Sequence, residues 1–289
     1  MSSNRLASTL KLYQGKALSL LTRHGKERVI GPALAARCGC EVVHTDAFDT
    51  DQLGTFTRDI PRAGTQREAA VRKARLGMAL TGLRIGLASE GAFAPDPYTG
   101  LLSWNYELVM LVDDERGLEL AGFFSGQSQS DSMYAANWTE VLQFADKARF
   151  PEHHLVVRPD SADHAQVRKG LDTLGSLRQA FDWAMSLAST GKVFLENDLR
   201  AHTNPSRMAN IQKAAVDLAE QMNSPCPACT SPGFWVRDLR RGLACQACGA
   251  PTREPIAKVW TCPKCDTRSE TPLSVGTFAD PGRCDFCNP

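Results

Sequence analysis

Four cysteine pairs, each with two residues between the cysteines, lie in the last quarter of the chain and constrain its fold more than any other feature. The pairs are Cys226/Cys229, Cys245/Cys248, Cys262/Cys265 and Cys284/Cys287. Two intervening residues let both thiolates bind one tetrahedral Zn²⁺, and a second pair completes the coordination shell. The pattern therefore predicts two Cys₄ zinc sites.

We assign the first two pairs to one zinc ion and the last two pairs to the other. A cross-braced arrangement, in which alternate pairs meet, satisfies the same spacing and stays open. The competing interpretations are disulfide bonds and redox-active CxxC pairs, but four tandem pairs beside glycine and proline fit zinc knuckles better. A closed Cys₄ shell leaves no position for substrate, so we expect both zinc ions to be structural.

The length of 289 residues fits one large domain and a small appendage. Helix-forming residues give way to Pro, Cys and Gly near Asn223. This change predicts an α/β domain over residues 1–223 and a double Cys₄ zinc-ribbon module over residues 224–289. No apolar stretch approaches the roughly 18 residues of a membrane span, and the N-terminus does not resemble a signal peptide. We therefore expect a cytoplasmic protein without membrane contact.

Short apolar runs alternate with helical patterns through the first two hundred residues, which is typical of an α/β layer architecture. Strands are predicted at residues 17–21, 40–44, 84–89, 108–112, 118–124 and 192–195. Helices are predicted at residues 29–36, 64–82, 138–148 and 162–188, and after Pro205. The fold class is α/β, with a mixed sheet in the large domain.

Two carboxylates lie at the ends of neighbouring elements of this predicted layer. Glu68 opens the clearest helix, and Glu90 follows a short strand and precedes Gly91. Carboxylates in these places can converge on one hard cation, and Mg²⁺ bound to phosphate oxygens takes only one or two protein carboxylates. A capping box with Thr65 is the competing interpretation for Glu68, and it is the stronger one when Glu68 is considered alone.

Basic and polar residues in two other places suggest contacts with an anion. Arg200 and His202 follow the predicted strand at 192–195, and we expect them to contact substrate or phosphate at the rim of the sheet. A loop that caps the last helix explains the same residues equally well. Arg62 and Arg67 lie at the start of the clearest helix, whose free amides and dipole attract anions.

Three short motifs in the first half of the chain resemble one known family. A strand precedes the turn Thr-Arg-His-Gly-Lys-Glu at 22–27, a helix carries Glu-Ala-Ala-Val-Arg-Lys-Ala-Arg at 68–75, and a strand ends in Ser-Glu-Gly at 89–91. Together they resemble the house-cleaning nucleoside triphosphate pyrophosphatases, particularly the inosine/xanthosine triphosphatase branch, over residues 17–129. The resemblance implies that Lys26 is directed at phosphate, with Thr22 and Arg23 beside the substrate. We interpret His24, in the same turn, as a solvated loop residue.

The sequence departs from that family at the acidic site. Family members have a paired Asp-Asp before Ser-Gly, whereas this chain has Ala88 and Ser89 before the single Glu90. Residues 131–199 and the zinc module have no counterpart in the compact family fold. The whole layout, including the motif at 195–208, is more similar to an uncharacterised bacterial domain-of-unknown-function family, DUF6671. That resemblance does not indicate what the protein does.

Two functions from different classes follow. The first is Mg²⁺-dependent hydrolysis of a nucleoside triphosphate, or a related phosphoanhydride, in which Glu68 and Glu90 hold Mg²⁺ and Lys26 neutralises phosphate charge. The second is a non-catalytic module that binds a nucleotide in its large domain and nucleic acid or protein through the zinc ribbons. Eight basic residues, six acidic residues, eight thiolates and two Zn²⁺ give the zinc module a net charge of −2, whereas nucleic-acid-binding ribbons are basic.

Overall fold

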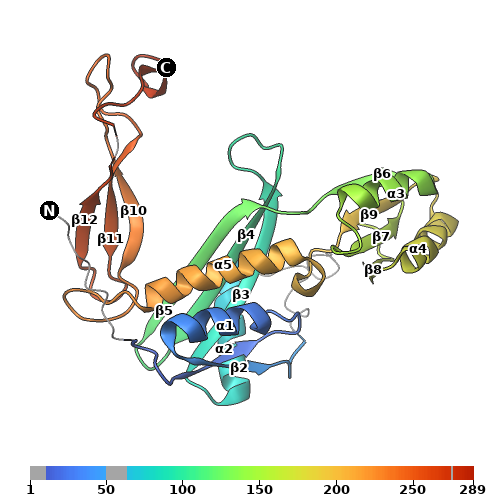
Figure 1. Ribbon diagram of the computed structural model, residues 1–289, viewed down its shortest axis with the longest axis horizontal. Helices are drawn as coiled ribbons and strands as arrows, with labels where there is room; N and C mark the ends of the chain where they lie inside the picture. The colour runs from blue at the N-terminus through green and yellow to red at the C-terminus, as the bar shows by residue number, and fades with distance from the viewer. Residues whose placement is uncertain (1–10, 50–63, 275) are drawn as a thin grey trace. The chain divides into compact units, whose positions relative to one another are not determined.

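The computed structural model describes residues 11–49, 64–274 and 276–289 (Figure 1). The chain divides into two compact units, of which the larger spans Tyr13–Ala219 and the smaller includes Glu220–Pro289. None of the helices in the described ranges combines the length and apolar character that crossing a bilayer requires.

A five-stranded mixed sheet forms the centre of the larger unit, in the order β2-β1-β3-β4-β5 (Figure 1). β1 (Ala17–Leu21) pairs in parallel with β2 (Glu41–Thr45) and β3 (Ile85–Pro95). β3, β4 (Ser103–Asp113) and β5 (Leu118–Gln127) form an antiparallel meander. The mixed α/β sheet predicted from the sequence is confirmed.

One helix packs on each face of the long strands. α2 (Gln66–Thr81) shares a buried apolar cluster with β4, which includes Ala74, Leu108 and Met110. α5 (Pro205–Met222) lies along the opposite face (Figure 1). Its backbone approaches β5 so closely that a Cβ at Gly122 would collide with backbone atoms of the helix.

α1 (Glu27–Cys38) connects β1 to β2, and the thiol of Cys38 donates to the carbonyl oxygen of Ala219 in α5 at 3.6 Å. The side of the sheet that carries α5 therefore carries α1 as well. The resulting three layers bury the apolar strands on both faces, which explains why β4 is a nearly continuous apolar run.

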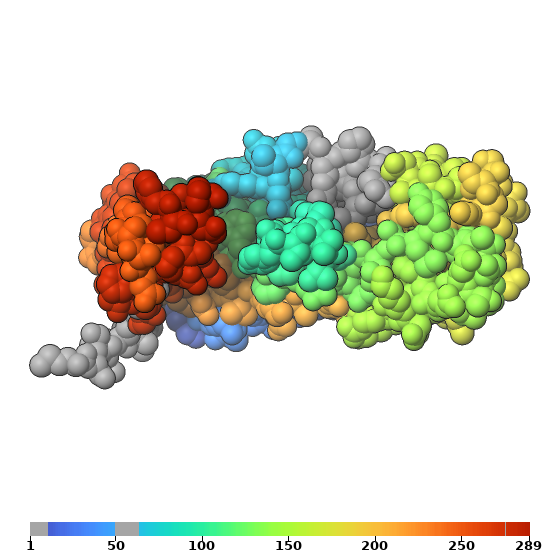
Figure 2. All heavy atoms as spheres, turned by 90° about the horizontal axis from the view of Figure 1, so that it is seen from above, coloured from blue at the N-terminus to red at the C-terminus, as the bar shows by residue number. Residues whose placement is uncertain are grey.

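A second, four-stranded sheet follows in the chain, in the order β6-β9-β7-β8. Its strands are β6 (Ser132–Ala135), β7 (Leu155–Pro159), β8 (Arg168–Leu171) and β9 (Val193–Asn197), and its helices are α3 (Trp138–Lys147) and α4 (Leu174–Leu187). Phe144, Leu177 and Phe181 belong to its own buried core. Figure 2 shows this part as one body of green to yellow spheres.

Two predictions of local structure were wrong. The helix predicted at 162–188 begins only at Leu174, because residues 168–171 pair with β7 as strand β8, so tertiary pairing overrides their helix propensity. The strand predicted to end at Glu90 and Gly91 continues to Pro95, because β4 pairs with β3 along its entire length. Glu90 and Gly91 are therefore residues of the middle of β3.

The smaller unit contains an antiparallel ribbon of β10 (Trp235–Arg241), β11 (Pro255–Thr261) and β12 (Arg268–Pro272). Among the described residues beyond α5, its buried apolar side chains are those of Pro232 and of four cysteines and two alanines: Cys226, Cys245, Cys262, Cys284, Ala257 and Ala279. A core of this composition buries too little apolar surface to hold a small fold together without a metal or covalent bonds.

Candidate functional site

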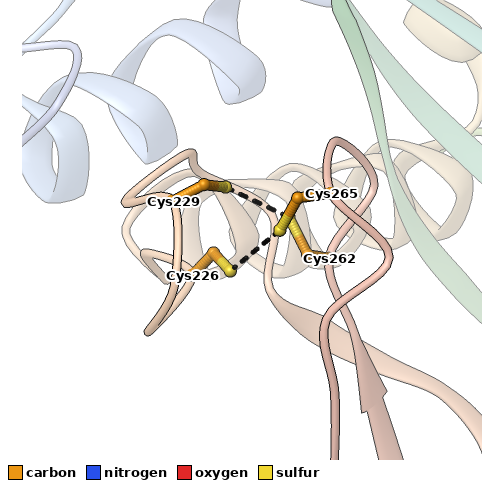
Figure 3. A group of neighbouring side chains, drawn as sticks. All are labelled: Cys226, Cys229, Cys262 and Cys265. Carbon is orange, nitrogen blue, oxygen red and sulfur yellow. Dashed lines mark hydrogen bonds between the residues drawn. The ribbon is translucent and has the colours of Figure 1, made fainter.

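The eight paired cysteines form two groups, within each of which all four sulfur atoms lie less than 4.8 Å apart. One group joins Cys226 and Cys229 to Cys262 and Cys265 (Figure 3). The other group contains Cys245, Cys248, Cys284 and Cys287. The first pair thus meets the third and the second meets the fourth, so our tandem assignment was wrong and the cross-braced alternative is observed.

The strand register explains the cross-brace. β10 leads away from the first cysteine pair, and β11 returns antiparallel to it, with Trp235 opposite Thr261. Because Cys262 directly follows Thr261, the third cysteine pair lies at the end of the ribbon where β10 begins, beside the first pair. A sequence pattern that shows only spacing does not reveal this return.

The sulfur positions match tetrahedral zinc. Sulfur–sulfur distances are 3.7 Å for Cys226–Cys265 and for Cys229–Cys262. In the other group they are 3.8 Å for Cys245–Cys287 and 3.7 Å for Cys248–Cys284. A tetrahedron with Zn–S bonds of about 2.3 Å has edges of about 3.8 Å. Each Cys₄ group can therefore bind one Zn²⁺, which would cross-link two distant loops.

The loops that carry the cysteines turn as zinc knuckles do. The amide of Ala228 donates to the Cys226 sulfur, and that of Lys264 donates to the Cys262 sulfur, both at 3.4 Å. Such bonds stabilise thiolate charge. Thr230, which directly follows Cys229, has a φ of 59° and so adopts the left-handed conformation where the chain turns.

Buried charge collects in the larger unit where β1 ends. β1 stops at Leu21, and its register with β3 places Leu20 beside Leu87. β3 therefore runs on past the end of β1. There the carbonyl oxygen of Ser89 accepts a hydrogen bond of 2.8 Å from Nζ of Lys26, whose buried side chain comes from the residue before α1.

α2 brings a second lysine to the same point from one face of the sheet. Lys73 forms a buried ion pair with Glu90, and only 11% and 9% of these two side chains are exposed. The side-chain amide of Gln66 donates to the backbone carbonyl oxygen of Glu90 at 2.8 Å and anchors the first turn of α2 on β3. Glu90 lies beyond the end of β1, although it is not at the end of its own strand.

A second buried ion pair occupies the opposite face. Glu107 of β4 lies directly across from Gly91, and its Oε1 accepts from Nε of Arg207 in α5 at 2.7 Å. Arg207 also donates to the carbonyl oxygen of Leu199, and Asn105 donates to Glu107 Oε1 at 2.9 Å. The other carboxylate oxygen of Glu107 is buried without a hydrogen-bond partner among the described residues.

Together Lys26, Lys73, Arg207, Glu90 and Glu107 form what we call the charge cluster. Burial, and then the positive charges of Arg207 and Lys73, lower the pKa of Lys26 to about 7 against the opposing effect of the two carboxylates. Three basic groups face two acidic ones. The cluster therefore has the electrostatics of an anion site rather than of a cation site.

Two histidines border the charge cluster. The rings of His24 and His202 lie 5.0 Å apart, and the pKa of His24 is lowered to about 3, first by burial and then by Lys26 and by His202. His24 is thus not the solvated loop residue that we expected. Arg200, which we expected to contact phosphate, donates to both carboxylate oxygens of the buried Asp198.

The remaining predicted site residues have other structural roles. Thr22 is buried directly after β1, where its hydroxyl accepts from the His24 amide at 3.3 Å. Arg23 pairs with Asp49, and Arg67 pairs with Glu119, both on the surface. These contacts leave the predicted substrate role of the three residues untested.

Glu68 closes the capping box with Thr65 that was the stronger interpretation of its motif. Hydrogen bonds from Thr65 lower the pKa of this exposed carboxyl. The role of Glu68 as a Mg²⁺ ligand stays a prediction. Arg62, which we expected to contact the anion, lies outside the described residues.

Glu107 and Arg207 were missed, and Lys73 was considered only as part of a family motif and of a basic stretch along its helix. Glu107 carried a usable signal, because it is a lone carboxylate in the apolar strand Tyr-Glu-Leu-Val-Met-Leu-Val. Gly91 carried another, since a glycine inside a strand often marks a close approach of other groups. Arg207 carried none, because an arginine in the first turn of a helix is usually solvated.

The family model described as Domain of unknown function (DUF6671) matches residues 73–289, which is most of the chain. The chain belongs to the DUF6671 family. No curated protein matches it. The matched part of this DUF6671 chain contains all eight paired cysteines and four members of the charge cluster, whereas Lys26 lies before it.

The cross-brace predicts the zinc content of double variants. Cys226→Ser/Cys262→Ser removes two ligands of one site and should retain about one zinc per chain after a mild chelator wash. Cys226→Ser/Cys245→Ser weakens both sites and should retain close to none. Elemental analysis of the washed proteins decides the matter, and the reverse order of zinc contents would restore the tandem pairing.

Gly91 should tolerate no side chain. A Cβ there would lie 2.5 Å from both Arg207 Nη2 and Glu107 Oε1, and these buried ends cannot swing into solvent. Gly91→Ala should therefore destabilise the larger unit by roughly 1–3 kcal/mol. Gly175→Ala in α4, where no atom lies within 4 Å, is the matched control and should leave stability unchanged or slightly raised. Equal denaturation midpoints for the two variants would show that Gly91 is not under this constraint.

Proposed function

We propose that this chain hydrolyses a nucleoside triphosphate, or a related phosphoanhydride, to release pyrophosphate. The observation that supports the proposal best is the charge cluster, in which three buried basic groups outnumber two carboxylates at the carboxyl end of a parallel strand. Ligands of α/β sheets bind at such strand ends. Buried ionisable groups with strongly shifted pKa values often mark functional sites, and the pKa of Lys26 in this cluster is strongly lowered.

Four members of the cluster have a direct role in this proposal. Lys26 and Lys73 bind phosphate oxygens, and Arg207 neutralises charge that develops in the transition state. When the polyphosphate draws Lys73 away, the carboxylate of Glu90 becomes free to accept a proton from water. That water attacks phosphorus, the α–β phosphoanhydride bond breaks, and pyrophosphate leaves.

The substrate of this reaction is the Mg²⁺ complex of the nucleoside triphosphate, in which phosphate oxygens and water coordinate the ion. The proposal does not require a protein ligand for the ion. The resemblance of the turn at 22–27 and the helix at 68–75 to inosine/xanthosine triphosphate pyrophosphatases supports the same substrate class, since Lys26 and Lys73 are the lysines of those motifs.

The zinc module has a structural role in the proposal, because closed Cys₄ sites offer no position for substrate. A contact of the module with nucleic acid or protein stays a prediction. Its net charge of −2 with both zinc ions bound favours protein over nucleic acid.

The decisive test incubates the zinc-loaded protein with Mg²⁺ and a panel of nucleoside triphosphates and measures released pyrophosphate. Lys73→Met and Glu90→Gln should each lower kcat/KM by about 10²-fold or more, the scale of lost electrostatic stabilisation. Lys16→Met is the matched control, because Lys16 is an exposed lysine paired with Glu115. Release of pyrophosphate that survives both cluster substitutions would refute the site, and no release with any nucleotide would favour the binding-module alternative.

A further inference from the structure

The three basic members of the charge cluster are not equivalent. Lys73 is paired with the carboxylate of Glu90, and Arg207 with that of Glu107. Lys26 bonds only to neutral acceptors among the described residues, the carbonyl oxygen of Ser89 at 2.8 Å and its hydroxyl at 3.4 Å. An uncharged amine still has two N–H donors, which is enough for both acceptors.

The surroundings of Lys26 disfavour its charged form. Its side chain is buried, and Arg207 from α5 and Lys73 from α2 place positive charge beside it. Glu90 and Glu107 attract its charge, but each already bonds another cation. His24, in the same loop, is itself held neutral. Neutral Lys26 leaves two complete ion pairs and no unbalanced charge.

We propose that the site takes up one proton together with each polyphosphate anion and that Lys26 carries this proton. An anion at the cluster supplies the negative charge that Lys26 lacks, so the ammonium form becomes the stable one when the ligand is bound. This inference rests on the proposed function, because it concerns the ligand of the same site. It adds that the empty site is electrically balanced and that ligand binding is linked to pH.

The pKa of Lys26 sets the pH at which the effect is measurable. With a pKa of about 7 in the free chain, Lys26 is about nine-tenths neutral at pH 8 and mostly protonated at pH 6. The lowered pKa rises on binding, so protons are taken up at pH 8 and hardly at all at pH 6. The terminal phosphate of a nucleoside triphosphate contributes little at pH 8, because the second pKa of a phosphate ester is near 6.

Calorimetric titration of the zinc-loaded full chain with a nucleoside triphosphate, without Mg²⁺, tests the inference. Titrations in Tris and in PIPES, or in another pair of buffers with different protonation enthalpies, give the protons bound per anion. We expect about 0.9 proton per anion at pH 8 and no net uptake well below the free pKa. Lys26→Arg should bind triphosphate at pH 8 without proton uptake, because arginine is always charged.

The outcomes separate this inference from the proposed function. Binding without proton uptake in the wild-type protein overturns the inference and leaves the proposed function standing. No binding of triphosphate overturns both. Lys16→Met, the exposed control, should match the wild type in affinity and in proton uptake. If Lys26→Arg fails to fold, the wild-type titrations in the two buffers decide the matter alone.

Discussion

The buried ion pair between Glu107 and Arg207 joins the central sheet to its longest helix, and much of the larger unit depends on it. The pair fixes the first turn of α5 over β4, and it requires Gly91 opposite because any side chain there would occupy the same space. Removing either partner would leave the other charge buried and unpaired, which typically costs about 3–5 kcal/mol. The geometry of the charge cluster is therefore tied to the folding of the sheet.

The end of β1 determines where this charge gathers. Because β3 and β4 continue beyond β1, their backbone and side chains are available at that level to Lys26 from the loop and to Lys73 from α2. The two ion pairs lie on opposite faces of one sheet. Lys26 donates a hydrogen bond to the backbone of that sheet, at Ser89 in β3. In the proposed function, such an arrangement would bind an anion without a separate pocket of loops, because its basic groups already lie together before a ligand arrives.

The sequence predicted those features that depend on local pattern. The bounds of β1 and the capping box of Thr65 and Glu68 follow from apolar runs and cap residues, and the eight cysteines follow from their spacing. Features that depend on pairing between distant segments did not follow. The length of β3 depends on β4, strand β8 depends on β7, and the zinc ligand sets depend on the register of β10 with β11. Arg207 joined the candidate site only when α5 was placed over Glu107.

The central claim is that the charge cluster exists to bind a polyphosphate, and a crystal structure with Mg²⁺ and an α,β-methylene nucleoside triphosphate tests it most directly. Phosphate oxygens should lie within about 3 Å of Nζ of Lys26 and of Lys73, with Lys73 drawn away from Glu90. A nucleotide bound elsewhere on the chain, with the Lys73–Glu90 pair intact, would contradict the claim.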